Sequence, residues 1–410
     1  MSRSTWGAVS HLPTAIVGGR VVTIEGGVIE RGTVVFRDGV ITAVGGPRTS
    51  LPARTSVLDA TGKWVLPGLI DAHTHLGVHE EADGWAGQDS NELTDPVTAH
   101  VRAIDAINPA DLGFRDAIAG GVLAVNVNPG SGNPIGGLTV ALRCYGRVVD
   151  EMVLRQPSGC KSALGENPKR VYEEKKQAPS TRLGTAAIIR EAFTKARDYE
   201  AARTATDSEA KPPDVDLKME SLAMVLRGEI PWRQHCHRAD DIATAMRIAD
   251  EFGYQLVIDH GTEAHLVADR LAARNIPVII GPLFTSRSKV ELRHRSLRNP
   301  GRLAAAGVTI ALTTDHPVVP IHFLVHEATL AVKEGLDPHV ALESLTINPA
   351  RILGIDDRLG SITSGKAADL CIWSGDPLDV MQRVERAFIN GREIYRYDYR
   401  EASGAFAELE

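Results

Sequence analysis

The 410-residue sequence predicts an α/β protein: a (β/α)₈ TIM barrel that carries a small β-sandwich domain built from both chain termini. Three observations predict this fold. Glycine-punctuated runs of β-branched residues occur at both ends of the chain. Between them, near-continuous apolar runs alternate with helical stretches, and eight such repeats cover roughly 290 residues, as a barrel of this kind requires. We expect sandwich segments at 1–63 and 356–410 and the barrel at 64–355.

The two ends of the chain carry short strands separated by turns. In the first sixty residues, the runs rich in β-branched residues are 15–17, 20–24, 34–37 and 40–44. Similar runs follow near the C-terminus at 370–373, 387–389 and 393–395. Asn390-Gly391 separates the last two runs, and this dipeptide is a strong signal for a hairpin turn. One β domain assembled from both termini follows from these strands.

The middle of the chain predicts the barrel. Apolar runs that do not alternate with polar residues are typical of strands covered on both faces. The clearest helix is expected over 238–252, with Asp240 and Asp241 in its first turn and Gly253 after its end. A long, charged segment at about 167–219 is expected to be a helical insertion over the barrel mouth. The eight candidate strands are 64–70, 122–127, 138–142, 160–164, 232–236, 255–258, 278–280 and 308–312.

Composition restricts the classes of partner. A net charge of −7 provides no basic surface for nucleic acid and no polybasic patch for a membrane. The sequence lacks an apolar run of about 18 residues and a recognisable signal peptide, so we expect a cytoplasmic protein. A small-molecule or peptide substrate is expected, and a homo-oligomer is left open. The widely spaced cysteines predict reduced thiols rather than a disulfide framework: Cys144, Cys160, Cys236 and Cys371.

Histidines and carboxylates gather at the carboxyl ends of the expected strands, where barrel enzymes place their active sites. The first strand ends in His73-Thr74-His75, and residues two apart on a strand face the same way, so both histidines can bind one ion. Imidazole and carboxylate ligands suit zinc or a similar divalent ion. We therefore expect one or two Zn²⁺ ions per chain, held by residues at the ends of strands one, five, six and eight: His73, His75, His235, His260 and Asp315.

A further metal ligand is expected from one of two residues near the fourth strand. Lys161 lies inside an apolar strand, where a charged amine is costly unless it is paired or neutralised. Reaction with CO₂ would convert it to an anionic carbamate that bridges two ions. The alternative ligand is the carboxylate of Glu166, five residues later and nearer the barrel mouth.

Catalytic and substrate-binding roles follow from the same positions. Asp315 is expected to accept a proton from a metal-bound water and return it to the leaving group, and His260 or His237 to stabilise the developing oxyanion. Arg287 and Lys289 follow the seventh strand and could hold a substrate carboxylate. We also expect His316 in the substrate pocket, where it would orient Asp315 or line the cavity.

Long segments of the chain resemble the amidohydrolase superfamily of metal-dependent hydrolases. Residues 65–75, VLPGLIDAHTH, resemble the first-strand signature of the superfamily. Residues 346–354, TINPARILG, and 360–370, GSITSGKAADL, resemble two further motifs of the superfamily. The resemblance covers about residues 14–397 and is strongest to the imidazolonepropionase and prolidase-like branches.

The resemblance implies a role for each matching residue. His73, His75, His235 and His260 correspond to metal ligands, and Asp315 to a residue that is both ligand and proton shuttle. Lys161 resembles the strand-four lysine that many members carbamylate. The chain departs from the superfamily at His237, close after His235, at His316, and in the long segment that begins near residue 165. These departures leave the number of ions and the substrate open.

The expected reaction is hydrolysis of a C–N bond by a metal-bound hydroxide, in an amide, a peptide or a cyclic amide or amidine. One alternative is a deaminase acting on a heterocyclic amidine. The lack of a glutamate shortly after His235 argues against it. The second alternative is a non-catalytic scaffold, against which the full set of expected metal ligands argues.

Overall fold

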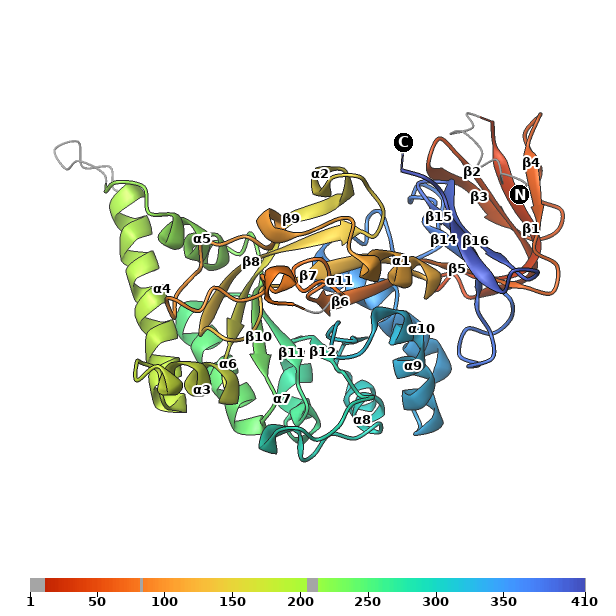
Figure 1. Ribbon diagram of the computed structural model, residues 1–410. Coiled ribbons are helices and arrows are strands. Elements are labelled where there is room, and N and C mark those ends of the chain that lie inside the picture. Colours follow the sequence, from red (N-terminus) through yellow and green to blue (C-terminus); the bar gives the residue numbers. More distant parts are fainter. Residues whose placement is uncertain (1–11, 82–83, 205–212, 410) are drawn as a thin grey trace.

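The computed structural model describes residues 12–81, 84–204 and 213–409 (Figure 1). Parts of the predicted segments 1–63, 167–219 and 356–410 therefore lie outside the described residues, namely 1–11, 205–212 and 410. Within the described ranges, the strands form two sheets, one from both ends of the chain and one from its middle. Figure 1 shows the first of these sheets beside the second, and in the first sheet the strands of the C-terminal end lie next to those of the N-terminal end.

The terminal sheet unites the two ends of the chain. Its central pairing joins β5 and β14 antiparallel, with Trp64 opposite Trp373. The expected hairpin turn is present, since Asn390 and Gly391 have φ angles of 48° and 71°, both left-handed as a type I′ turn requires. Strand pairing links nine described strands into a single sheet, and a division into two packed layers stays a prediction. These strands are β1 (Thr14–Val22), β2 (Val28–Arg37), β3 (Val40–Gly45), β4 (Ser56–Asp59), β5 (Trp64–Pro67), β14 (Leu370–Trp373), β15 (Val384–Ile389), β16 (Arg392–Asp398) and β17 (Ser403–Phe406).

The second sheet is a nearly closed barrel. Its eight described strands follow one another in sequence order from β6 to β13, and β13 contacts β6. The carboxyl ends of β6, β10, β11 and β13 meet at one end of this barrel, which positions the candidate site. The strands are β6 (Leu69–Thr74), β7 (Val122–Val127), β8 (Ile135–Arg143), β9 (Val153–Ala163), β10 (Trp232–Cys236), β11 (Leu256–His260), β12 (Val278–Ile280) and β13 (Ile310–Leu312).

The third barrel strand differs from the expected (β/α)₈ pattern. β8 runs antiparallel to both β7 and β9, whereas the other neighbouring pairs from β9 to β13 are parallel. A parallel crossover needs about a dozen residues or more. Only the short segment 128–134 joins β7 to β8, so the chain reverses direction there instead of crossing back.

The expected first barrel strand, 64–70, is wrong as a single element because it divides at Gly68. Residues Trp64–Pro67 form β5 in the terminal sheet, and Leu69–Thr74 form β6 in the barrel. A Cβ atom at Gly68 would lie 2.7 Å from the side chain of Leu123 on β7. The absence of a side chain at Gly68 thus permits the close approach at which the chain changes sheets. The domain limits at 63 and 355 stay a prediction.

Most of the described helices lie around the barrel (Figure 1), whereas α11 packs against β6 and β13. α4 packs beside α6, with ion pairs from Arg182 to Asp241 and from Arg190 to Glu251. This position differs from the expected insertion over the mouth, although Asn167, at the beginning of α3, does lie there. The helices are α1 (Leu112–Ala119), α2 (Val149–Met152), α3 (Glu166–Glu174), α4 (Arg182–Thr204), α5 (Leu217–Leu226), α6 (Ala239–Phe252), α7 (Ala268–Ala273), α8 (Asn299–Ala305), α9 (Leu324–Lys333), α10 (Pro338–Ser344) and α11 (Ile347–Leu353). Short 3₁₀ turns are η1 (Trp85–Gly87), η2 (Ala103–Ala106), η3 (Ala264–Leu266), η4 (Val290–Leu292) and η5 (Ile321–Phe323).

The structure also bears on the expected reduced cysteines and on the expected absence of a membrane-spanning helix. All four cysteines are buried and free. Over the ranges that the structure describes, no helix has both the length and the apolar character needed to cross a membrane.

Candidate metal centre

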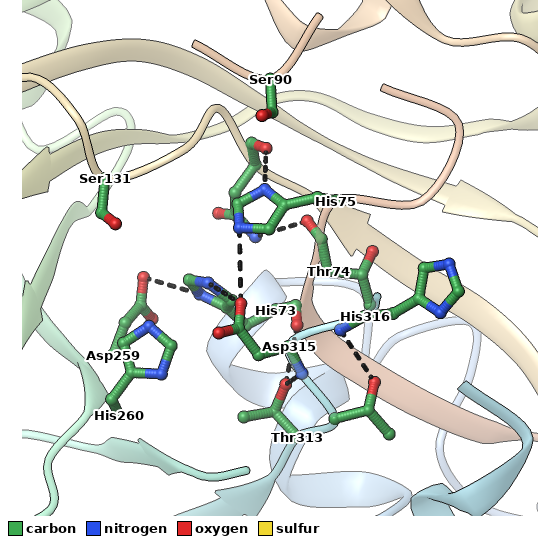
Figure 2. A network of polar contacts seen from close by, with 12 residues as sticks. His73, Thr74, His75, Ser90, Ser131, Asp259, His260, Thr313, Asp315 and His316 are labelled. Carbon is green, nitrogen blue, oxygen red and sulfur yellow. Dashed lines mark hydrogen bonds and ion pairs between the residues drawn. The ribbon is translucent and has the colours of Figure 1, made fainter. Parts of the chain in front are cut away.

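Two histidines and one aspartate meet at the mouth of the barrel. The Nε2 atoms of His73 and His75 each lie 3.4 Å from Oδ1 of Asp315 (Figure 2). Ligand atoms around a tetrahedral zinc ion, at about 2.1 Å from it, are roughly 3.4 Å apart. The chain therefore brings the ends of β6 and β13 together in a geometry that fits one divalent ion.

The histidines of β10 and β11 border this group. The ring centroid of His260 lies 4.7 Å from that of His73 and 4.5 Å from that of His235. Both ring nitrogens of His235 are buried without a hydrogen-bond partner, and so is Oδ1 of Asp315. Buried polar atoms normally have partners, so these free lone pairs fit ligation of a cation. Burial lowers the pKa of His235 and His260, which favours the neutral imidazoles that metals bind.

Backbone carbonyl groups orient two of these rings. Nδ1 of His75 lies 2.8 Å from the carbonyl oxygen of Asn128, and Nδ1 of His260 lies 2.8 Å from that of Gly281. Each of these contacts leaves the Nε2 atom free for an ion, as the outer contacts of metal-binding histidines commonly do.

The side chain of Lys161 lies beside the histidine cluster, as the sequence predicted. Its side chain is fully buried, with Nζ 3.2 Å from Nε2 of His73 and 3.9 Å from Oδ2 of Asp259. Burial lowers the pKa of Lys161 to about 8, against the attraction of Asp259. Glu166 lies elsewhere: it begins α3, and its backbone N–H donates to the carboxylate of Glu291. Among the described contacts, the Glu166 carboxylate has none with the histidines.

Sequence reasoning missed a buried ion pair beneath the cluster. Oδ2 of Asp259 lies 3.0 Å from Nδ1 of His73, and Oδ1 lies 3.3 Å from Nη2 of Arg233. The same nitrogen of Arg233 donates to the carbonyl oxygen of Ala72 at 2.6 Å. Although burial opposes it, Arg233 and His73 hold the pKa of Asp259 well below its usual range. Like Lys161, Arg233 and Asp259 are charged residues inside apolar strands, and this feature is visible in the sequence.

A cavity of about 290 Å³ opens above the cluster. Lys289 is in its wall, and Nζ of this lysine donates to Oδ1 of Asn167 at 2.8 Å. Ser90 and Ser131 lie on the open side of the cluster in Figure 2. The complete lining is His75, His79, Ser90, Asn91, Gly130, Ser131, Asn167, His235, His237, His260, Pro282, Thr285, Ser288, Lys289, Leu292, Asp315, Pro317 and Val318.

Two residues expected in the substrate pocket face elsewhere. Arg287 is not among the residues that line this cavity, and its Nη2 donates to the carbonyl oxygen of Arg295. His316 is fully buried, with Nε2 3.4 Å from Glu81 and Nδ1 accepting from the backbone N–H of Ile321. Lys289 is therefore the expected substrate-binding residue that the structure brings to the cavity.

Comparisons with known proteins identify the family. The amidohydrolase family matches residues 64–394. The amidohydrolase tasK of Hapsidospora irregularis is 30% identical over 386 residues, which are 88% of this chain and 39% of that protein's length. An imidazolonepropionase of Maricaulis maris is 27% identical over 397 residues, 89% of this chain and 93% of the relative.

Solved structures support the same assignment. The crystal structure of an amidohydrolase from Thermotoga maritima is 45% identical, has a TM-score of 0.90, and matches over 93% of this chain and 100% of its own. A prolidase complexed with N-methylphosphonate-L-proline, at 21% identity and a TM-score of 0.62 over 94% of this chain and 100% of its own, shares the fold. The chain thus belongs to the amidohydrolase family and is a hydrolase that acts on carbon–nitrogen bonds.

Proposed function

We propose that this chain is a metal-dependent amidohydrolase that cleaves a C–N bond in a small or peptide-derived substrate with an acidic group. The observation that carries the proposal is the convergence of His73, His75 and Asp315, with ligand atoms 3.4 Å apart, at the base of a cavity. We propose zinc as the ion, one or two per chain, with Lys161 as a carbamate ligand where two are bound.

Asp315 is suited to proton transfer. When bound, a divalent ion polarises a carbonyl oxygen and lowers the pKa of a water molecule to about 7. Burial disfavours the charge of Asp315, but His260 and His73 outweigh it and hold its pKa well below the usual range. The carboxylate is therefore ionised at neutral pH, and beside its role as a ligand through Oδ1 it can accept a proton and pass it to the leaving nitrogen.

The wall of the cavity supports an acidic substrate. The ammonium group of Lys289 faces the cavity beside neutral histidines, and a charge-assisted hydrogen bond would hold a carboxylate there. N-acyl amino acids, dipeptides and cyclic amides with a carboxylate are the substrate classes that this arrangement fits. The imidazolonepropionase names of several relatives and the prolidase name of a structural neighbour guide the same choice.

A substrate panel tests the proposal. Zinc-loaded protein is incubated with N-acyl amino acids, dipeptides, cyclic amides and heterocyclic amidines, and products are identified by mass spectrometry with a separate assay for ammonia. We expect C–N cleavage of a carboxylate-bearing substrate without release of ammonia. Ammonia released from an amidine would support the deaminase alternative instead. Lack of any product from metal-loaded protein would support the scaffold alternative.

One lysine variant and one arginine variant test the contact between Lys289 and the substrate. Lys289→Met should raise KM about tenfold, equivalent to the loss of about 1.4 kcal/mol of binding. Arg287→Met makes the same charge change two residues away but outside the cavity, so its KM should stay near that of the wild type. Equal effects of the two substitutions would contradict a direct contact of Lys289 with the substrate.

A further inference from the structure

We propose a further metal position formed by His235, His237 and Glu291, separate from the position of His73, His75 and Asp315. The candidate ligand atoms of the three residues all lie within 4.8 Å of one another. Each side chain is almost completely buried, with 3%, 5% and 2% of its residue surface exposed, respectively. The three residues differ from His73, His75 and Asp315, although His235 is also an expected ligand of the proposed metal centre, so this inference extends the proposed function.

The geometry of His237 favours an ion rather than a direct hydrogen bond. Nδ1 of His237 lies 2.8 Å from Oγ1 of Thr262, which leaves Nε2 free. That Nε2 atom lies 3.8 Å from Oε1 of Glu291, too far for a hydrogen bond. Two ligand atoms of a tetrahedral zinc ion are roughly 3.4 Å apart, so a shift of a few tenths of an ångström would complete the pair.

The carboxylate of Glu291 is held by one oxygen and free at the other. Oε2 accepts from the backbone N–H of Glu166 at 3.1 Å and lies 3.8 Å from Nη2 of Arg182. Oε1 is buried without a hydrogen-bond partner, and both ring nitrogens of His235 are unpartnered too. An unpaired, buried carboxylate oxygen beside unpaired imidazole nitrogens is costly unless a cation binds between them.

The neighbouring cationic side chains do not pair with Oε1 of Glu291. Arg182 faces Oε2, and Lys289 donates to Asn167 at 2.8 Å. Two imidazoles and one carboxylate suit zinc, iron(II) or manganese(II). Because His235 and His237 line the cavity, the remaining coordination positions of the ion would face the substrate.

Anomalous scattering from crystals of the zinc-loaded protein tests the position directly. We expect one peak among His235, His237 and Glu291 and another among His73, His75 and Asp315. Crystals without the first peak would overturn this inference whether or not the second is present. Missing density at the second would instead contradict the metal centre of the proposed function.

Metal analysis of two glutamate variants provides a second readout. Glu291→Gln should lower the zinc content by about one ion per chain and remove the peak beside His237. Glu263→Gln is the matched control, because Glu263 is also buried but accepts from Ala239 and His294. The control should keep the zinc content of the wild type. Retention of the full zinc content in Glu291→Gln would overturn the inference.

Discussion

Two aspartates, Asp369 buried at the terminal sheet and Asp315 partly buried at the barrel mouth, have contrasting surroundings. Asp369 accepts from Nε of Arg143 at 2.7 Å and from the backbone N–H of Asn390 at 2.8 Å. Asp315 has an unpaired Oδ1 whose neighbours are two imidazoles at 3.4 Å. A carboxylate whose partners are all supplied by the chain stabilises the fold. One that the chain leaves unpaired is available to an ion and to a proton.

The backbone shows the same contrast. In the terminal sheet, the left-handed residues Asn390 and Gly391 form the turn for which their residue types are suited. At the barrel mouth, His260 adopts a φ angle of 74° at the end of β11, outside any turn, whereas Asp315, with a φ angle of 51°, begins a turn in which its carbonyl oxygen accepts from the backbone N–H of Val318. Left-handed backbone at such residues costs about 1 kcal/mol or more, and it is concentrated at functional sites.

The largest expected effect belongs to Asp315. Asp315→Asn should lower kcat about 10³-fold, within the range that general acid–base groups contribute, because the amide cannot accept the proton. Steady-state kinetics on a substrate from the panel measure this effect, and calorimetry confirms that the variant is folded. Near-normal kcat in this variant would contradict the assigned role.

The reciprocal change at Asp369 should affect stability instead. Asp369→Asn weakens the contact with Arg143 and should lower the free energy of unfolding by about 2 kcal/mol, as a charge-assisted hydrogen bond would. The kcat of the folded fraction should remain that of the wild type. Urea denaturation gives the stability. A variant as stable as the wild type would break the contrast between the two aspartates.

A third buried carboxylate, Glu327 on α9, sharpens the comparison through pH. It accepts from the backbone N–H groups of Leu283 and Phe284, and burial raises its pKa to about 7. Between about pH 4.5 and 7 the folded chain therefore binds more protons at this residue than the unfolded chain, so its contribution to stability falls as pH rises.

Replacing Glu327 tests this sign. Glu327→Gln should flatten the dependence of the unfolding free energy on pH in that interval, by at most about 3 kcal/mol. Urea denaturation at a series of pH values measures the difference between the two proteins. A pH dependence that is unchanged by the substitution would show that Glu327 is not the group responsible.

The sequence predicted the site best where chemistry follows directly from strand ends. The bounds of β7, β10, β12 and β14 match the predicted runs, because continuous apolar stretches define buried strands. The meeting of His73, His75 and Asp315 was predicted because residues at the carboxyl ends of barrel strands share one face.

The parts that sequence reasoning missed depend on long-range geometry. Nothing in the apolar run of β8 encodes its direction, which the short connection from β7 determines. Glu291 lies in the short 3₁₀ turn η4 and meets His237 through the folded barrel. Arg287 points away from the cavity and His316 is buried because of the conformation of their loops, which residue type alone does not define.

Metal content tests the central claim most directly. Zinc-loaded protein is dialysed and analysed by inductively coupled plasma mass spectrometry beside His73→Ala/His75→Ala and a control double variant. The control, His322→Ala/His339→Ala, removes two histidines with side chains 37% and 53% exposed. We predict at least one retained ion per wild-type and control chain, and the loss of one ion from the His73/His75 variant. A wild-type protein without retained zinc, or equal zinc in all three proteins, would contradict a metal centre at the barrel mouth.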